Sequence, residues 1–147
     1  MSSLGTPPAD SPVDWVRQHI ERYVATGGED GHEWRGTRTL LLTVTGRKSG
    51  QPHRTALIYA ADGDDFLIVA SKGGAPEHPL WYLNLAADPT VQVQVGPRVF
   101  TATARTATAQ ERPRMWPLVV AAWPAYVDYQ KATEREIPVV VLTAGSG

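Results

Sequence analysis

Residues 39–60 read TLLLTVTGRKSGQPHRTALIYA, two apolar runs joined by a basic connection. The runs, Leu40–Val44 and Ala56–Ala60, have the length and composition of strands, so the segment predicts a β-hairpin. A connection that only reverses the chain needs about two to five residues. This connection, Gly46–Thr55, is longer and contains three Lys or Arg side chains. It is therefore either a solvated basic turn or a binding site for an anionic group.

Further strand and helix patterns lie on both sides of the hairpin. Asp62-Gly63-Asp64 is typical of a tight turn, and apolar residues that alternate with polar ones indicate half-buried strands. The predicted strands are Thr39–Thr45, Thr55–Ala61, Asp65–Ser71, Val91–Val95, Arg98–Thr106 and Ile137–Thr143. The predicted helices are Val13–Ala25, Pro79–Ala87, Thr108–Ala122 and Pro124–Thr133. Mostly antiparallel strands interrupted by helices predict an α+β barrel or roll, and they argue against a doubly wound parallel sheet.

Composition limits the classes of function. The chain has 147 residues and a net charge of −1, so no overall field attracts nucleic acid or an anionic membrane. It has no cysteine, and its four histidines lack the spacing of metal ligands. No apolar run has the length of a membrane span, and the first residues do not resemble a signal peptide. We expect a mobile polar leader over residues 1–10, a single domain over residues 11–147, no metal site, no nucleic-acid partner and a cytoplasmic location.

The predicted N-terminal helix is amphipathic. Its apolar residues recur at helical spacing, and Gly27 follows its end. The apolar face consists of Val13, Val16, Ile20, Tyr23 and Val24. Because the polar face carries charges of both signs, we expect this helix to pack on the protein and cover an opening of the sheet. Peripheral contact with a membrane is the alternative.

A second segment, Ser71–Leu85, also combines glycines with positive charge. Lys72 precedes two glycines, which places exposed backbone N–H groups beside an ammonium group and suits an anion. Trp81 is available to pack on a flat ring, although Trp81 and Leu85 also have the spacing of ordinary core residues. Together with the basic connection, the segment suggests an elongated anionic ligand with an aromatic part. The sequence contains no recognisable acid–base pair or activated nucleophile, so a bound cofactor would supply the chemistry of an enzyme.

Several motifs together resemble the deazaflavin-dependent nitroreductase family of actinobacteria. They are Thr45-Gly46-Arg47-Lys48-Ser49-Gly50, Arg54-Thr55, Ser71-Lys72-Gly73-Gly74-x-Pro76-x-His78-Pro79-x-Trp81-x-x-Asn84-Leu85 and Arg135-Glu136-Ile137-Pro138-Val139. The resemblance extends from about residue 12 to residue 143. It implies a split β-barrel, related in fold to FMN-binding oxidases, that binds coenzyme F420.

The resemblance also implies roles for individual residues. The basic hairpin would hold the phosphate and the acidic tail of F420, and the second segment would run along its ring and linker. The implied cofactor-binding residues are Arg47, Lys48, Ser49, Gly50, Arg54, Thr55, Ser71, Lys72, Gly73, Gly74, His78, Trp81 and Asn84. The implied catalytic residues are Ser71, Tyr126 and Tyr129, whose hydroxyl groups would donate to the electron acceptor. Packing against the sheet is the alternative for the two tyrosines.

Three functions remain open. We favour an F420H2-dependent reductase that transfers a hydride to a quinone, a nitroaromatic compound or another small conjugated acceptor. A non-catalytic binder or carrier of F420 is one alternative, and an FMN-dependent enzyme of the same barrel superfamily is the other. In the favoured case the protein mainly has to align donor and acceptor. Split barrels of this type often pair, which leaves a homodimer open.

Overall fold

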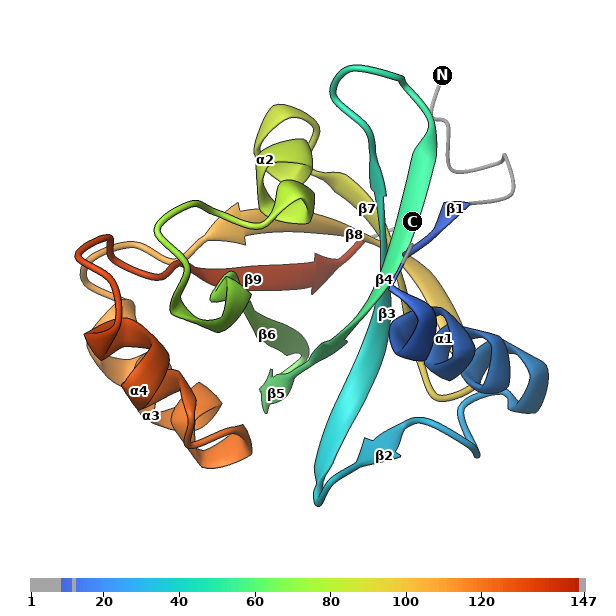
Figure 1. Cartoon of the computed structure of the whole chain (residues 1–147), viewed down its shortest axis with the longest axis horizontal. Helices are drawn as coiled ribbons and strands as arrows, with labels where there is room; N and C mark the ends of the chain where they lie inside the picture. Colours follow the sequence, from blue (N-terminus) through green and yellow to red (C-terminus); the bar gives the residue numbers. More distant parts are fainter. Residues whose placement is uncertain (1–8, 12, 146–147) are drawn as a thin grey trace.

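A strongly curved sheet with helices along its edges forms the fold (Figure 1). The computed structural model describes residues 9–11 and 13–145. The described strands form a nine-stranded sheet in the order β1-β4-β3-β7-β8-β9-β6-β5, with β2 paired to β3 beside this path. Every pairing is antiparallel except that of β1 with β4. The strands are β1 (Ala9–Asp10), β2 (Glu33–Trp34), β3 (Thr37–Thr45), β4 (Pro52–Ile58), β5 (Ala60–Asp62), β6 (Asp65–Val69), β7 (Thr90–Val95), β8 (Arg98–Thr106) and β9 (Val139–Ala144).

The predicted α+β class and the mostly antiparallel sheet are confirmed, but the sheet is not closed. Its path runs from β1 to β5, and no pairing joins these two ends in the described part of the chain. The predicted strand Thr55–Ala61 divides at Tyr59, because β4 pairs with β3 whereas β5 pairs with β6. The backbone N–H of Tyr59 still donates to the carbonyl of Arg38 at 3.1 Å. The apolar pattern continues through this change of partner, so the pattern alone could not reveal it.

The N-terminal segment is partly ordered against the sheet. Ala9 and Asp10, which were predicted to end a mobile leader, form β1 and pair with His53 and Arg54 of β4. The rest of that predicted leader, residues 1–8, lies outside the described residues. The β3–β4 hairpin, which carries the basic connection, therefore has β1 as a neighbour along the outer edge of β4.

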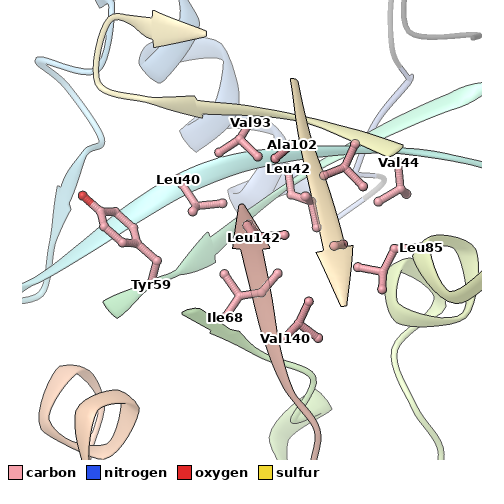
Figure 2. Close-up of a cluster of buried hydrophobic side chains, with 12 residues drawn as sticks. Leu40, Leu42, Val44, Tyr59, Ile68, Leu85, Val93, Ala102, Val140 and Leu142 are labelled. Carbon is pink, nitrogen blue, oxygen red and sulfur yellow. The ribbon is translucent and has the colours of Figure 1, made fainter. Parts of the chain in front are cut away.

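The larger core cluster lies inside the curve of the sheet, where side chains from β3, β6, β7, β8 and β9 meet Leu85 of α2 (Figure 2). Leu40, Leu42 and Leu142 are fully buried within it. On the opposite face of β3, Leu41 packs against α1. The strand is therefore buried on both faces, as its continuous apolar run predicted.

Helix α1 (Asp14–Thr26) covers the outer face of β3 and ends at Gly27, which has a left-handed φ of 61°. Its buried residues are His19, Ile20 and Tyr23, so the predicted packing against the sheet is confirmed. The apolar side chains at its two ends, Val13 and Val24, remain exposed. Within the described residues, no helix has the length and apolar character needed to cross a membrane.

The remaining helices lie at the other edges of the sheet. Helix α2 (Leu80–Ala87) contacts β3 and β8, and the 3₁₀ turn η2 (Lys72–Gly74) contacts α4 (Tyr126–Lys131). Helix α3 (Arg112–Ala122) and α4 pack on the outer face of β6 and β9 around a second apolar cluster. The predicted cap of α3 is present, because Thr108 and Glu111 exchange hydrogen bonds, although the α-helix itself begins at Arg112.

Candidate active site

A cleft of about 440 Å³ opens between the β3–β4 hairpin and the start of α2, and we call it the cationic cleft. Its walls combine Arg and Lys side chains with apolar and aromatic ones. The lining residues are Ala9, Asp10, Ser11, Val44, Gly46, Arg47, Lys48, Ser49, His53, Arg54, Thr55, Lys72, Pro79, Leu80, Trp81 and Asn84. Such a lining suits a ligand with both anionic and apolar parts.

The tip of the hairpin is folded tightly and is attached to α2. The N–H of Gly50 donates to the carbonyl of Gly46 at 2.8 Å. A Cβ at Gly46 would lie 2.6 Å from Ser49 Oγ and 2.9 Å from His53 Nε2, so a side chain at this position would displace these two neighbours. The backbone N and the Nη1 of Arg47 both donate to Asn84 Oδ1, at 3.1 and 2.8 Å. Asn84 is buried, and its side-chain oxygen joins the hairpin tip to α2, so these two segments form one wall of the cleft.

Two of the four Lys and Arg side chains in the cleft are paired with carboxylates. Arg54 Nε donates to Asp10 Oδ1 at 2.6 Å, and Lys72 Nζ donates to Glu77 Oε1 at 3.1 Å. Lys48 is exposed and has no carboxylate partner within residues 9–11 and 13–145. The positive charge available to a ligand is therefore concentrated at the hairpin tip.

A second hollow, of about 250 Å³, lies between α1, β4 and α4, and we call it the aromatic pocket. Its lining residues are Trp15, Val16, His19, Trp34, Thr39, Ala56, Leu57, Ile58, Val69, Ser71, Gly73, Trp123, Tyr126 and Tyr129. The Trp15 and Trp34 rings are stacked, with centroids 5.8 Å apart and planes 12° apart, and Trp34 also contacts Trp123 at 5.7 Å. Walls of this kind suit a flat conjugated molecule.

Three hydroxyl groups of the aromatic pocket are placed to donate hydrogen bonds to a ligand. Burial, followed by the charge of Tyr129, raises the pKa of Tyr126, so its hydroxyl stays neutral at physiological pH. The Tyr129 oxygen accepts a hydrogen bond from Trp123 Nε1 at 3.4 Å, which leaves the Tyr129 proton for another acceptor. The hydroxyl of Ser71 is the third such group in the lining. The pocket can therefore donate hydrogen bonds to an oxygen that becomes negative.

A buried histidine also lines the aromatic pocket. Burial, followed by the charge of Arg22, lowers the pKa of His19 and favours its neutral form. His19 Nε2 lies 3.2 Å from Thr39 Oγ1, and this hydroxyl donates to the carbonyl of Gly31 at 2.6 Å. Because the Thr39 proton is used in that bond, His19 Nε2 is the donor to Thr39. The imidazole therefore has a fixed tautomer.

The linings of the two hollows meet at the turn η2. Lys72 lines the cationic cleft, whereas its neighbours Ser71 and Gly73 line the aromatic pocket. On β4, Thr55 and Ala56 also line different hollows, because successive side chains of a strand point to opposite faces of the sheet. One elongated molecule can therefore contact both hollows.

Most of the predicted site residues lie in one of these hollows. The cationic cleft contains Arg47, Lys48, Ser49, Arg54, Thr55, Lys72, Trp81 and Asn84, and the aromatic pocket contains Ser71, Gly73, Tyr126 and Tyr129. Three predicted residues line neither hollow. Gly50 turns the hairpin tip at a φ of 71°, Gly74 is buried against α4, and His78 packs on Tyr82 with a centroid distance of 4.8 Å. These three residues shape or support the walls.

The sequence pattern did not indicate several residues of the site. Trp15 and Trp34 come from α1 and from the two-residue strand β2, and neither belongs to an apolar period. Asp10 fell within the predicted leader. Arg135 belongs to a motif of the resemblance, yet its role is visible only in the structure, where its guanidinium donates to backbone carbonyls of the Ser71–Pro79 loop. For metal ligands, the described residues contain no group of three or more His, Asp or Glu side chains placed to hold an ion.

Similarity to known proteins shows which family the chain belongs to. A protein-family model described as F420H2-dependent quinone reductase matches residues 15–144. An F420H2-dependent quinone reductase of Mycobacterium tuberculosis (strain H37Rv) is 46% identical over 135 residues, which cover 89% of this chain and 91% of the relative.

Two solved structures are similar in both sequence and fold. One, described as a domain-swapped dimer, is 43% identical with a TM-score of 0.70, and the match covers 90% of this chain and 99% of that chain. The other, the F420-H2 dependent reductase FDR-A, is 44% identical with a TM-score of 0.66, and the match covers 71% of this chain and 92% of that chain.

The region matched by the family model contains the whole aromatic pocket and all of the cationic cleft except Ala9, Asp10 and Ser11. The predicted resemblance to deazaflavin-dependent reductases is thereby confirmed. This chain belongs to the F420H2-dependent quinone reductase family.

Proposed function

We propose that this chain binds coenzyme F420 and transfers a hydride from its reduced form to a quinone. The observation that carries the proposal is the junction of the cationic cleft with the aromatic pocket at η2. F420 combines an acidic tail with a flat ring, and the two hollows offer a cationic and an aromatic environment in series. Among the acceptors considered from the sequence, a quinone is favoured by the description of the family model.

The residues of the cationic cleft fit an anionic tail. We assign the phosphate and the acidic tail to Arg47, Lys48 and Lys72, because guanidinium and ammonium groups form charge-assisted hydrogen bonds with such oxygens. Lys48 has no competing carboxylate among the described residues, whereas Arg54 is paired with Asp10. The hairpin tip is therefore the strongest part of the proposed anion site. Trp81 adds an aromatic surface to the same cleft.

The protein residues align the hydride donor with the acceptor and exclude water, while the cofactor supplies the redox chemistry. When bound, reduced F420 provides the hydride from its deazaflavin ring. Ser71, which precedes η2, and Gly73, which lies within it, both line the aromatic pocket, so they can hold a donor ring and an acceptor in contact. The hydroxyls of Ser71, Tyr126 and Tyr129 donate to the acceptor oxygen as negative charge develops there. Trp34 and Trp123 add aromatic surface beside these hydroxyls.

Two measurements test this function. Titration of the purified protein with F420, followed by cofactor fluorescence, should show saturable binding. Mixing the protein with F420H2 and menadione should then restore the absorption band of the oxidised deazaflavin. Binding without turnover over a panel of quinones and nitroaromatic compounds would identify a carrier. Tight retention of FMN during purification would identify an FMN enzyme.

We also propose that the chain forms a single split-barrel domain, which includes β1 from Ala9 on, and that this domain forms a homodimer. The curved open sheet supports the split barrel, and a similar solved structure described as a domain-swapped dimer supports the pairing. Size-exclusion chromatography with light scattering should give twice the chain mass, and denaturation should give one cooperative transition. A monomeric mass would reject the dimer.

A cytoplasmic location with peripheral membrane contact through α1 is a separate proposal. Val13, Trp15 and Val24 are large apolar side chains of this region that remain exposed. Co-sedimentation with anionic lipid vesicles should be weak and should fall further in Val13→Glu, because apolar burial is the main source of such binding. Equal sedimentation of the two proteins would reject this contact.

A further inference from the structure

The turn η2, where the two hollows meet, has a strained backbone. Lys72, Gly73 and Gly74 have consecutive positive φ values of 47°, 63° and 85°. The left-handed region costs free energy for a residue with a Cβ, so Lys72 remains there only if other contacts hold it. Within the turn, Gly74 N donates to the carbonyl of Ser71 at 2.9 Å and Ala75 N donates to that of Lys72 at 3.1 Å.

One side chain contacts both ends of this turn. Arg135 Nη1 donates to the carbonyl of Ala70 at 3.2 Å, and Nη2 donates to that of Ser71 at 2.8 Å. Beyond the turn, Arg135 Nε donates to the carbonyl of Ala75 at 2.9 Å, and Nη1 donates to His78 Nδ1 at 3.0 Å. A planar guanidinium offers its donors in a fixed arrangement. It therefore holds the backbone on both sides of the strained residues.

The same turn touches the helix that carries the pocket tyrosines. A Cβ at Gly74 would lie 2.7 Å from the carbonyl oxygen of Tyr129 and 3.0 Å from Ala132 Cβ. The backbone of the turn therefore packs directly on α4 and the residues that follow it. Arg135 itself lies four residues beyond the end of α4 at Lys131. A displacement of the turn would change its position relative to Tyr129 across the aromatic pocket.

We propose that Arg135 is a positioning residue for the reaction. By holding both sides of η2, it keeps Lys72 in the cationic cleft and Ser71 in the aromatic pocket. Arg135 is in the lining of neither hollow, so its removal takes away no group that contacts a ligand there. The inference rests on the proposed function for its meaning, but the state of the turn can be measured without any ligand.

Arg135→Gln and Arg112→Gln form a matched pair of variants. Arg112 also uses a half-buried guanidinium to hold the chain, with Nη1 donating to the carbonyl of Ile137 at 2.6 Å and Nη2 to Gln130 Oε1 at 3.2 Å. In hydrogen exchange of the ligand-free full chain, the amides of Gly74 and Ala75 should exchange faster in Arg135→Gln only. In the same variant the affinity for F420 should fall about tenfold, the scale of one lost charged hydrogen bond.

A conservative variant separates positioning from charge. Arg135→Lys retains the positive charge, but a point-like ammonium cannot reach both sides of the turn as a planar guanidinium does. We expect this variant to fold and still to show faster exchange at Gly74 and weaker F420 binding. It also provides the test if Arg135→Gln does not fold.

The results that would overturn the inference are distinct from a failure of the proposed function. Unchanged exchange at Gly74 and Ala75 in both Arg135 variants would overturn it, and so would an affinity for F420 equal to that of the unaltered protein in both. Failure of the unaltered protein to bind F420 would instead reject the proposed function. In that case the exchange experiment would still decide whether Arg135 holds the turn.

Discussion

Arg54 Nε donates a hydrogen bond to Asp10 Oδ1 at 2.6 Å inside the cationic cleft. The two residues lie opposite each other because β1 pairs in parallel with β4. Their side chains are only 21% and 19% exposed, so water screens this ion pair less than it screens a surface pair. The carboxylate of Asp10 thus binds the guanidinium of Arg54, which the family resemblance assigns to cofactor binding. An anionic ligand must compete with Asp10 for Arg54.

Asp10→Asn should therefore strengthen F420 binding by about three- to tenfold, since it removes a competing and repelling charge. A fluorescence titration at low salt measures the change. Asp14→Asn is the control, because Asp14 pairs with Arg17 at 2.7 Å and neither residue lines the cleft. Weaker binding in Asp10→Asn would mean that Asp10 orients Arg54 for the ligand and does not compete with it.

Lys48→Glu should weaken F420 binding more than tenfold, because it removes a charge-assisted contact worth about 1.5–3 kcal/mol and adds repulsion. Lys131→Glu makes the same change in net charge at the end of α4, outside both hollows. Titrations at low and high salt should show a steeper salt dependence for the unaltered protein than for Lys48→Glu. Equal affinities of the two variants would exclude the hairpin tip as the site of the tail.

Tyr129→Phe should lower kcat for quinone reduction about tenfold or more and leave the affinity for F420 unchanged, because it removes a donor to the developing negative charge. Tyr82→Phe is a matched control, since its hydroxyl bonds Thr106 Oγ1 at 2.8 Å outside both hollows. Stopped-flow measurement of F420H2 oxidation separates the chemical step from binding. Equal kcat values for Tyr129→Phe and the unaltered protein would assign Tyr129 to packing alone.

Features of the fold that depend on local patterns could be predicted from the sequence. Arg98–Thr106 alternates in polarity and forms β8 with the predicted bounds. The Asp-Gly turn at Gly63 connects β5 and β6, as its turn chemistry indicated. The composition of Gly46–Thr55 likewise indicated a basic connection, because length and charge are both local properties, and Arg47, Lys48 and Arg54 line the cationic cleft. The site residues in this connection follow from that composition together with the family resemblance.

Relationships between distant segments could not be predicted, because no local pattern encodes them. Asp10 meets Arg54 only through the β1–β4 pairing, and β1 has only two residues, too short for a period to be recognised. Trp15 meets Trp34 because α1 and β2 both lie beside β3. Arg135 reaches Ala70 across the chain. The same limitation applies to the division of the predicted site into two hollows.

Burial, followed by the positive charge of Arg135, lowers the pKa of His78. The folded state therefore prefers neutral imidazole, whose Nδ1 accepts from Arg135. This stabilisation is complete above the pKa of the imidazole in the unfolded chain, about 6.5. It is lost as the pH falls through the lower pKa that His78 has in the folded protein. His78→Asn keeps an acceptor oxygen but cannot be protonated in this range, so its unfolding free energy should fall less on acidification. Urea denaturation at neutral and mildly acidic pH measures the difference, and equal losses would exclude His78.

Gly74→Ala should destabilise the protein much more than Gly63→Ala. Both glycines have positive φ, +85° and +60°, so both variants carry the left-handed strain of about 1–2 kcal/mol. A Cβ at Gly63 would meet no atom within 4 Å, whereas one at Gly74 would lie 2.7 Å from the carbonyl oxygen of Tyr129. Overpacking of this kind typically adds about 1–3 kcal/mol.

Urea denaturation of the two variants isolates the close contact from the backbone strain. Equal losses would mean that α4 yields at Tyr129 without cost. The aromatic pocket would then change shape in Gly74→Ala, because Tyr129 and Gly73 line it from the two sides of this contact. The KM for the quinone would then rise in Gly74→Ala, although its free energy of unfolding would equal that of Gly63→Ala. A larger loss of stability, in contrast, means that the turn and α4 form one rigid wall, as the alignment of donor and acceptor requires.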